Sequence, residues 1–293
     1  MSDEKNTGST ESKIDKKILE NPFVGSLVVP IAIVLVGALV VFGVTKMISS
    51  ETSYKDLVRE MKSKTFGNKW VAALELSKVI SAGKIPEEDI PWLIENLDDI
   101  YTNTIDTRTK DFIVVAAGAI GDRRSLKIIE KGLSEKDKNI KFHSVVALSN
   151  MKLPNNFDWT KVKSFLSSDD KALVQASVLA LATHRVENVE DEIKPLLSNT
   201  DGFALRYAAA TALVYYKEEV ALPVLGEILS LDETSHGKTL SVDEIGGLKL
   251  NVLSAAKKVQ WKRLEVLIER MTQREKDIKV KAFAEDVLKS FKE

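Results

Sequence analysis

The segment Asp201-Gly-Phe-Ala-Leu-Arg-Tyr-Ala-Ala-Ala-Thr-Ala-Leu213 carries the pattern on which the predicted fold rests. An acidic residue is followed by small and apolar residues at helical spacing, which predicts a capped, alanine-rich helix. The same plan follows three other aspartates, Asp137, Asp170 and Asp277. Leu148, Leu181 and Leu213 close three of these copies and lie 33 and 32 residues apart. A fixed period in this range predicts an array of stacked helix pairs.

On both sides of this stretch, alanine-rich segments alternate with segments rich in leucine and isoleucine. The predicted pairs are 70–76 with 90–97, 112–120 with 125–133, 138–150 with 159–166, 170–182 with 189–197, 202–216 with 220–229, and 248–256 with 261–271. A single last helix begins near Asp277. No pair can bury its apolar face alone, so each needs its neighbours in the array.

Two sequence patterns resemble those of HEAT repeats, including the HEAT-like repeats of bacterial proteins related to phycobilisome lyases. One is the turn Ala119-Ile-Gly-Asp-Arg-Arg-Ser-Leu-Lys-Ile-Ile129, and the other is an apolar–basic pair after the acidic residue, as in Leu205-Arg206. The resemblance covers residues 67–293 and implies an all-α fold, an α-solenoid that winds antiparallel helix pairs into a right-handed superhelix. It also implies that the second helix of each pair lines the inner curve.

The N-terminal region differs in character from the repeats. Residues 1–22 are polar and charged, which predicts a disordered tail. Residues 23–46 are apolar and carry no charge before Lys46. At about 1.5 Å per residue they are long enough to cross a hydrocarbon core of roughly 30 Å. The sequence therefore predicts a single transmembrane helix, which the chain retains because its apolar run exceeds that of a signal peptide.

The side of the membrane on which the repeats lie is less strongly indicated. Basic residues are almost evenly divided between the two flanks of the apolar segment, so the positive-inside rule gives no clear direction. A short charged tail usually stays in the cytoplasm, which favours an extracytoplasmic repeat domain. Residues 47–66 predict a short amphipathic helix next to the membrane, with Tyr54, Leu57, Val58 and Met61 on its apolar face.

Composition limits the kinds of chemistry that the chain offers. The sequence has a formal net charge of −1 and no cysteine, which excludes disulfides and thiolate sites. Basic and acidic residues are mixed along the helices, so we expect no nucleic-acid binding. The three histidines lie far apart, and the sequence has no nucleophile elbow or phosphate-binding loop. We therefore predict no metal, no cofactor and no catalytic residues.

Two features of the sequence suggest partner-binding residues. One is the set of large aromatic side chains, and the other is a pair of connections that are longer than the repeat period needs. Trp159, Tyr216 and Trp261 lie on second helices or at their entries, and tryptophan and tyrosine are favoured at interfaces. Residues 98–109 and 232–243 are expected to be long connections, and insertions of this kind often carry function. His236 and Lys238 in the second connection are candidates for contact with an anion or a partner.

These observations predict a membrane-anchored HEAT-repeat scaffold or adaptor, not an enzyme, that binds a protein partner close to the bilayer. Two alternatives remain open. One is a lyase-type enzyme or ligand-binding protein, which would need a deep pocket with convergent polar groups. The other is a permanent structural subunit of a membrane complex, which would expose a large apolar patch when isolated.

Overall fold

The computed structural model describes residues 53–63, 69–198, 202–235 and 239–292. Within these ranges all regular secondary structure is helical. The α-helices are α3 (Tyr54–Lys62), α4 (Lys69–Ser81), α5 (Ile90–Asn103), α6 (Thr107–Ile120), α7 (Leu126–Leu133), α8 (Lys138–Asn150), α9 (Thr160–Ser164), α10 (Lys171–Thr183), α11 (Glu190–Ile193), α12 (Phe203–Val214), α13 (Leu222–Leu229), α14 (Val242–Val259), α15 (Glu265–Arg274) and α16 (Ile278–Ser290). Short 3-10 turns extend or join several of them. This confirms the predicted helical-repeat fold.

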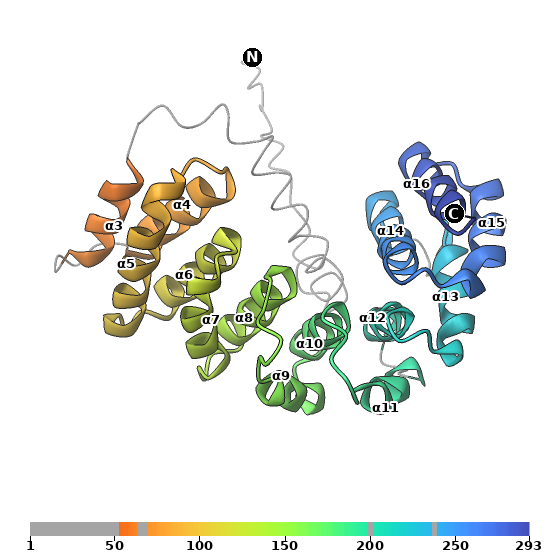
Figure 1. Cartoon of the computed structure of the whole chain (residues 1–293), viewed down its shortest axis with the longest axis horizontal. Helices are drawn as coiled ribbons and strands as arrows, with labels where there is room; N and C mark the ends of the chain where they lie inside the picture. Colours follow the sequence, from red (N-terminus) through yellow and green to blue (C-terminus); the bar gives the residue numbers. More distant parts are fainter. Residues whose placement is uncertain (1–52, 64–68, 199–201, 236–238, 293) are drawn as a thin grey trace, which may run out of the picture.

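The helices form two rows along a curved array (Figure 1). The inner row consists of α4, α6, α8, α10, α12, α14 and α16, and each of these helices packs directly on the next. The outer row consists of α5, α7, α9, α11, α13 and α15. The alanine-rich first helix of each pair therefore lines the inner curve. The expectation that the second helices line it is wrong.

Side-chain size explains which row is inside. A Cβ atom built on Gly118 of α6 would lie 2.6 Å from the Cβ of Ala147 on α8. The outer helices also approach the inner row closely, since a Cβ atom built on Gly132 of α7 would lie 2.1 Å from the Oγ of Ser144 on α8. Small residues allow this close approach, whereas leucine and isoleucine on the outer helices hold those helices farther apart. An array that is tighter on one side curves toward that side.

The acidic residues that precede the inner helices act as N-caps. The side chains of Asp106, Asp137, Asp170 and Asp277 accept hydrogen bonds from backbone N–H groups in the first turn of α6, α8, α10 and α16. Ser241 and Glu244 form a capping box at the start of α14. These bonds satisfy donors that have no partner within the helix. The predicted helix starts at Asp137, Asp170 and Asp277 are confirmed, and Asp201 lies outside the described residues.

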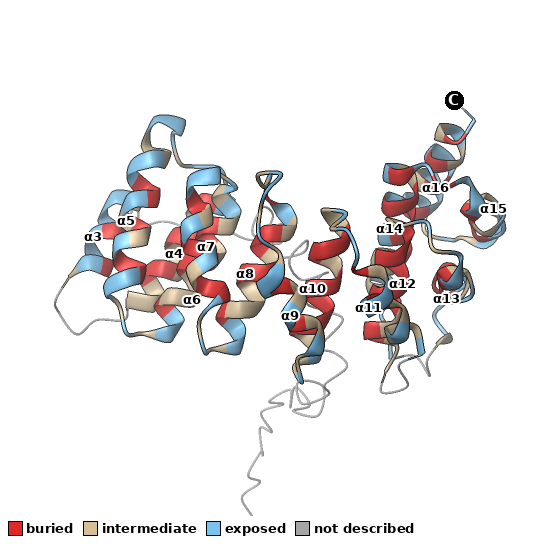
Figure 2. Ribbon diagram, turned by 60° about the horizontal axis from the view of Figure 1, so that its bottom comes forward, coloured by how far each residue is buried: buried red, intermediate tan, exposed pale blue. Residues whose placement is uncertain are grey.

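The core is a band along the array. Buried apolar residues form one connected cluster that runs from Leu57 in α3 to Phe291 after α16. Figure 2 shows the buried residues on the sides where helices meet and the exposed ones on the outside. Helix α3 packs on α4 and α5 and buries Leu57, Val58 and Met61. The array therefore includes α3.

The first of the two long connections is shorter than expected. Asp98–Asn103 completes α5, and α6 begins at Thr107, so only residues 104–106 join these helices. The sequence prediction of a loop over 98–109 is therefore wrong. Its polar side chains lie at helix ends, where threonine and asparagine bond back to the preceding turn, as Thr102 does to the Asp98 carbonyl. The second connection, between α13 and α14, is present, and residues 236–238 of it are not described.

The transmembrane prediction falls outside the described part of the chain. Residues 1–22 and 23–46 both precede residue 53, where the described structure begins. Among the residues that the structure describes, no helix combines the length and the apolar character that a membrane span requires.

Candidate functional site

Trp159 and Tyr216 lie against the C-terminal end of α10. The Trp159 ring centroid is 5.0 Å from that of His184, the C-cap residue of α10. The Tyr216 hydroxyl oxygen is 3.2 Å from the carbonyl oxygen of Leu181 and 3.0 Å from that of Val186. Burial raises the pKa of Tyr216. Both aromatics are partly exposed, so they join neighbouring pairs while keeping some surface for a partner.

The other three candidates are placed differently. Trp261 is 6% exposed and belongs to the core between α14 and α15, which leaves it little surface for a partner. His236 and Lys238 lie outside the described residues, and their proposed role stays a prediction. The structure therefore brings two of the candidates to one helix end and places Trp261 elsewhere.

A cavity of about 940 Å³, which the sequence did not indicate, lies near the C-terminal end of the array. It lies between α13, the first half of α14, α15 and the turn before α16. Leu229, Ile245, Leu267 and Met271 supply apolar parts of its wall. Its volume falls within the range of small-molecule pockets, roughly 300–1,000 Å³.

A buried ion pair closes one wall of this cavity. The Lys249 Nζ atom on α14 lies 2.5 Å from the Glu275 Oε2 atom, and each side chain is 8% exposed. The other Glu275 oxygen accepts hydrogen bonds from the backbone N–H groups of Lys276 and Asp277. Burial by itself would raise the pKa of the Glu275 carboxyl. The hydrogen bonds from Lys249 and from the two backbone N–H groups lower it by more than burial raises it, so the pKa lies below its ordinary value. The Glu275 carboxylate therefore stays ionised at neutral pH.

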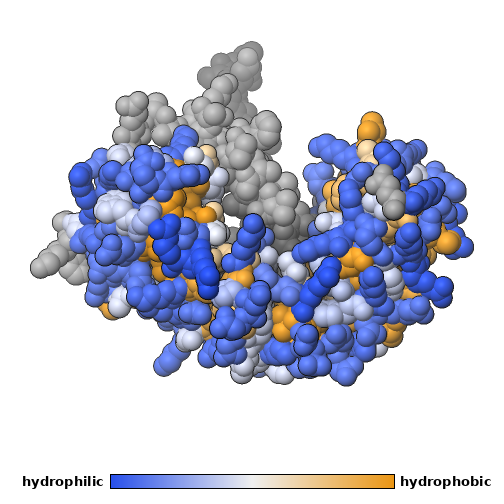
Figure 3. Space-filling view, viewed as in Figure 1, coloured by the Kyte–Doolittle hydropathy of each residue, from blue (hydrophilic) through white to orange (hydrophobic). Residues whose placement is uncertain are grey.

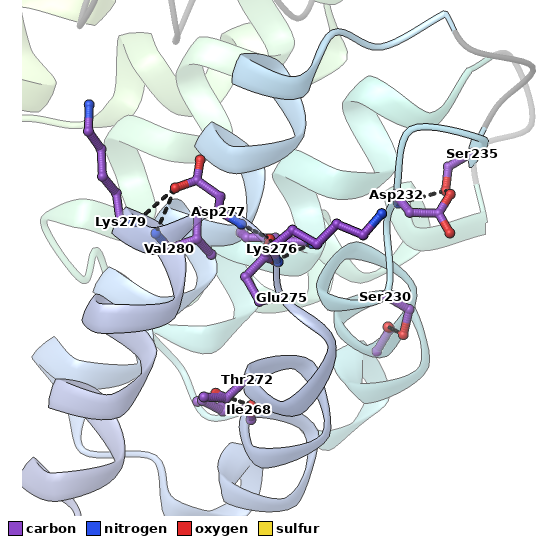
Figure 4. A network of polar contacts seen from close by, with 12 residues as sticks. Ser230, Asp232, Ser235, Ile268, Thr272, Glu275, Lys276, Asp277, Lys279 and Val280 are labelled. Atoms are coloured by element: carbon purple, nitrogen blue, oxygen red, sulfur yellow. Dashed lines mark hydrogen bonds and ion pairs between the residues drawn. The ribbon is translucent and has the colours of Figure 1, made fainter.

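Two turns face each other across the cavity. In Figure 4, Glu275 and Asp277 lie in the turn before α16, and Asp232 and Ser235 lie in the turn after α13. The Asp232 carboxylate accepts hydrogen bonds from Thr234 and Ser235, which lower its pKa. Asp277 accepts from the N–H groups of Lys279 and Val280. Both carboxylates are thus engaged with their own turns.

Three basic residues of the cavity rim have no such local bonds. Arg270, Arg274 and Lys276 line the cavity and are exposed. In the described residues, none of the three takes part in an ion pair. Arg270 and Arg274 are one helical turn apart on α15, so both side chains lie on the same face. In the sequence, this rim is marked by two arginines four residues apart. The same spacing is also typical of an ordinary solvent-exposed helix face, so it does not by itself indicate a site.

Hydrophilic side chains cover most of the face seen in Figure 3, and apolar ones show between them at helix junctions. In the described residues, no group of three or more histidine, aspartate or glutamate side chains could hold a metal ion.

The described residues thus define a helical-repeat protein with a curved inner surface and a large cavity near its C-terminal end. No family model matches the chain, and no curated protein matches it. Among solved structures, the chain is similar to the X-ray structure of YibA from Escherichia coli, with 16% sequence identity and a TM-score of 0.48. The match covers 80% of this chain and 82% of YibA.

Proposed function

We propose that this protein is a membrane-held scaffold of the HEAT-like class that binds a protein partner along the inner curve of its array. The observation that carries the proposal is a line of apolar side chains on successive inner helices. Val115, Val146 and Leu179 each lie nine residues after the aspartate that caps their helix. All three are partly exposed, although most apolar residues of these helices are buried.

Their repeated position indicates which way these side chains face. Each inner helix packs on its two inner neighbours and on outer helices, so its remaining side faces the inner curve. Residues at one position of every repeat therefore form a line along the array. Extended inner surfaces of this kind are the binding surfaces of solenoid proteins. Trp159 and Tyr216 at the end of α10 add aromatic surface of the kind that anchors protein partners.

The membrane part of the proposal is supported by the apolar, uncharged segment 23–46. The described array begins at Tyr54, only a few residues later, which would keep its first helices near the bilayer. A short charged tail before a transmembrane segment usually stays in the cytoplasm, which supports an extracytoplasmic array.

Site-specific photocrosslinking tests this proposal. A benzoylphenylalanine residue replaces Val146 or Leu179 in the full-length protein, and membranes are irradiated. A matched control replaces Lys161, which is exposed on the outer helix α9. We expect both inner positions to capture the same protein and Lys161 not to capture it. Capture from Lys161 alone, or from none of the three positions, would overturn the proposal.

The cavity favours a second candidate function, that of a ligand-binding protein or a lyase-type enzyme. Such a protein needs a deep pocket with polar groups at its wall, and the cavity has both the volume and the Lys249–Glu275 pair. The third alternative is a permanent subunit of a membrane complex. It differs from a scaffold in one respect: the partner that crosslinking identifies would also co-purify from membranes that had not been irradiated.

A further inference from the structure

Helices α3 and α5 lie side by side at the N-terminal end of the array and run in the same direction (Figure 1). Near the start of α3, the Lys55 Nζ atom lies 3.1 Å from a carboxylate oxygen of Asp89, the N-cap residue of α5. At the end of α3, the Lys62 Nζ atom lies 2.7 Å from a carboxylate oxygen of Asp99, in the second half of α5. Both helices therefore begin at the same edge of the array, which we call the entry edge.

Two aromatic rings and a lysine lie together at the entry edge. The rings of Tyr54 and Trp92 meet edge to face, with their centroids 6.5 Å apart. The Lys55 Nζ atom lies 5.6 Å from the centroid of the Tyr54 ring and 5.8 Å from that of the Trp92 ring. Trp92 is 37% exposed, so part of a large apolar ring faces outward. Tryptophan, tyrosine and lysine combine an apolar body with a polar end, and such side chains collect at the level of lipid head groups.

The connection between this edge and the predicted transmembrane segment is short. Lys46, the last residue of that segment, and Ser53, the first described residue, are seven residues apart. At 3.3–3.6 Å per residue, this stretch spans at most about 25 Å. The other edge is a helix length away, since α5 has 14 residues and is about 21 Å long. The chain thus attaches to the membrane segment through the edge that carries Tyr54 and Trp92.

The charges around these rings are mixed. Lys55 and Asp89 form an ion pair, and the neighbouring side chains of Lys84, Glu87 and Glu88 are all exposed. There is no excess of positive charge that would select anionic lipid. The aromatic rings need none, because an indole or phenol ring gains free energy at the head-group level through its apolar body and its polar end. A lipid contact at this edge should therefore form on zwitterionic lipid.

We propose that the entry edge rests on the bilayer surface, with the rings of Trp92 and Tyr54 at the level of the lipid head groups. The other edge, which includes Ile105 in the connection between α5 and α6, then faces away from the membrane. This inference rests on the membrane anchor of the proposed function. It adds which edge of the array touches lipid and which residues make the contact.

Lipid-attached quenchers test the orientation. The sequence has no cysteine, so one introduced cysteine carries one label. Glu88→Cys places a fluorophore at the entry edge, and Ile105→Cys places it at the other edge, where residue 105 is fully exposed. Each labelled full-length chain is placed in phosphatidylcholine nanodiscs, with or without lipid that carries a nitroxide on its head group. We expect quenching at residue 88 to be at least threefold greater than at residue 105. Equal quenching, stronger quenching at residue 105, or none at either position would overturn the proposal.

A second measurement tests the role of the ring itself. Trp92→Ala in the Glu88→Cys chain should lower the quenching at residue 88 by at least half. Trp70→Ala is the matched control, because Trp70 lies near the start of α4 and stacks on Phe112 of α6, away from the entry edge. It should leave the quenching within a tenth of its original value. If both variants have native circular dichroism and quench equally, Trp92 does not hold this edge on the lipid.

Failure of this proposal and failure of the membrane anchor give different results. A chain without an anchor elutes separately from the nanodiscs. An anchored chain in another orientation elutes with the nanodiscs and is not quenched preferentially at residue 88. Crosslinking from Val146 and Leu179 tests the inner curve and does not depend on either result.

Discussion

Gly118 of α6 faces Ala147 of α8 so closely that an added Cβ atom would lie 2.6 Å from the Ala147 Cβ and 3.2 Å from its Cα. Both contacts are with atoms fixed to the backbone of α8. Any side chain at residue 118 therefore pushes the two inner helices apart. The tight inner row, and with it the curvature of the array, depends on contacts of this kind.

The first prediction concerns this contact. Gly118→Ala is expected to lower the free energy of unfolding by about 1–3 kcal/mol, because overpacking outweighs the better helix propensity of alanine. Urea denaturation of the purified protein measures the change. Gly226→Ala in α13 is the matched control, since its Cβ would meet Leu267 at an ordinary 3.6 Å. The control should leave stability unchanged or raise it by up to about 1 kcal/mol. Equal effects of the two variants would contradict the close-packing argument.

The second prediction concerns the helix caps. Asp170→Ala removes the acceptor for the N–H groups of Ala172 and Leu173, and is expected to cost about 1 kcal/mol of stability. Asp169→Ala, at the neighbouring exposed residue, makes the same change of charge without removing a cap. It should change stability by less than about 0.5 kcal/mol. Chemical denaturation separates the two, and a larger loss from Asp169→Ala would argue against the capping role.

The third prediction concerns the buried ion pair. Lys249→Met leaves the Glu275 carboxylate in the cavity wall without its cation. We expect a loss of about 2–4 kcal/mol, near the lower end of values for broken buried pairs, because two backbone N–H groups still bond the carboxylate. Adding Glu275→Gln should recover more than half of the loss in urea denaturation. If the double variant is no more stable than Lys249→Met, the charge of Glu275 is not the cause.

The fourth prediction is the pH dependence of the same pair. The Glu275 pKa is lower in the folded protein than its ordinary value of 4.5. A depressed carboxyl pKa stabilises the fold above the unfolded-state value and ceases to do so as the pH falls through the folded-state value. The stability difference between the native protein and Glu275→Gln should therefore be constant from pH 7 to about 5 and shrink below about 4.5. A difference that stays the same down to pH 3 would show that ionisation of Glu275 is not involved.

The fifth prediction separates the array from the N-terminal segment. A chain lacking residues 1–46 should be soluble, helical by circular dichroism and cooperative in thermal unfolding, because the described residues from Leu57 to Phe291 form one connected apolar core. The full-length chain should remain in the membrane fraction. Retention of the shortened chain on membranes after a high-salt wash would reveal another anchor.

The sequence suggests candidate partner-binding residues, but it does not reveal how the fold arranges them. Trp159 and Tyr216 are candidates because both lie on second helices or at their entries and because tryptophan and tyrosine are favoured at interfaces, and the structure places both at the end of α10. Trp261 met the same criterion but is buried, because the position of an aromatic along a helix does not reveal whether a neighbouring pair covers it. The cavity was not predicted, since its wall combines residues from α13, α14, α15 and the turn before α16.

The sequence by itself determined the helical pairs and their order. Capping aspartates, apolar periodicity and a repeat of 32 or 33 residues are local signals, and the helices they predict are present. Tertiary structure alone decided which row lies inside, how far α5 extends into the expected loop, and where a cavity opens. These features depend on how closely helices from different repeats approach, as at Gly118 and Ala147. Such distances are set by contacts between residues far apart in the chain, which no local pattern records.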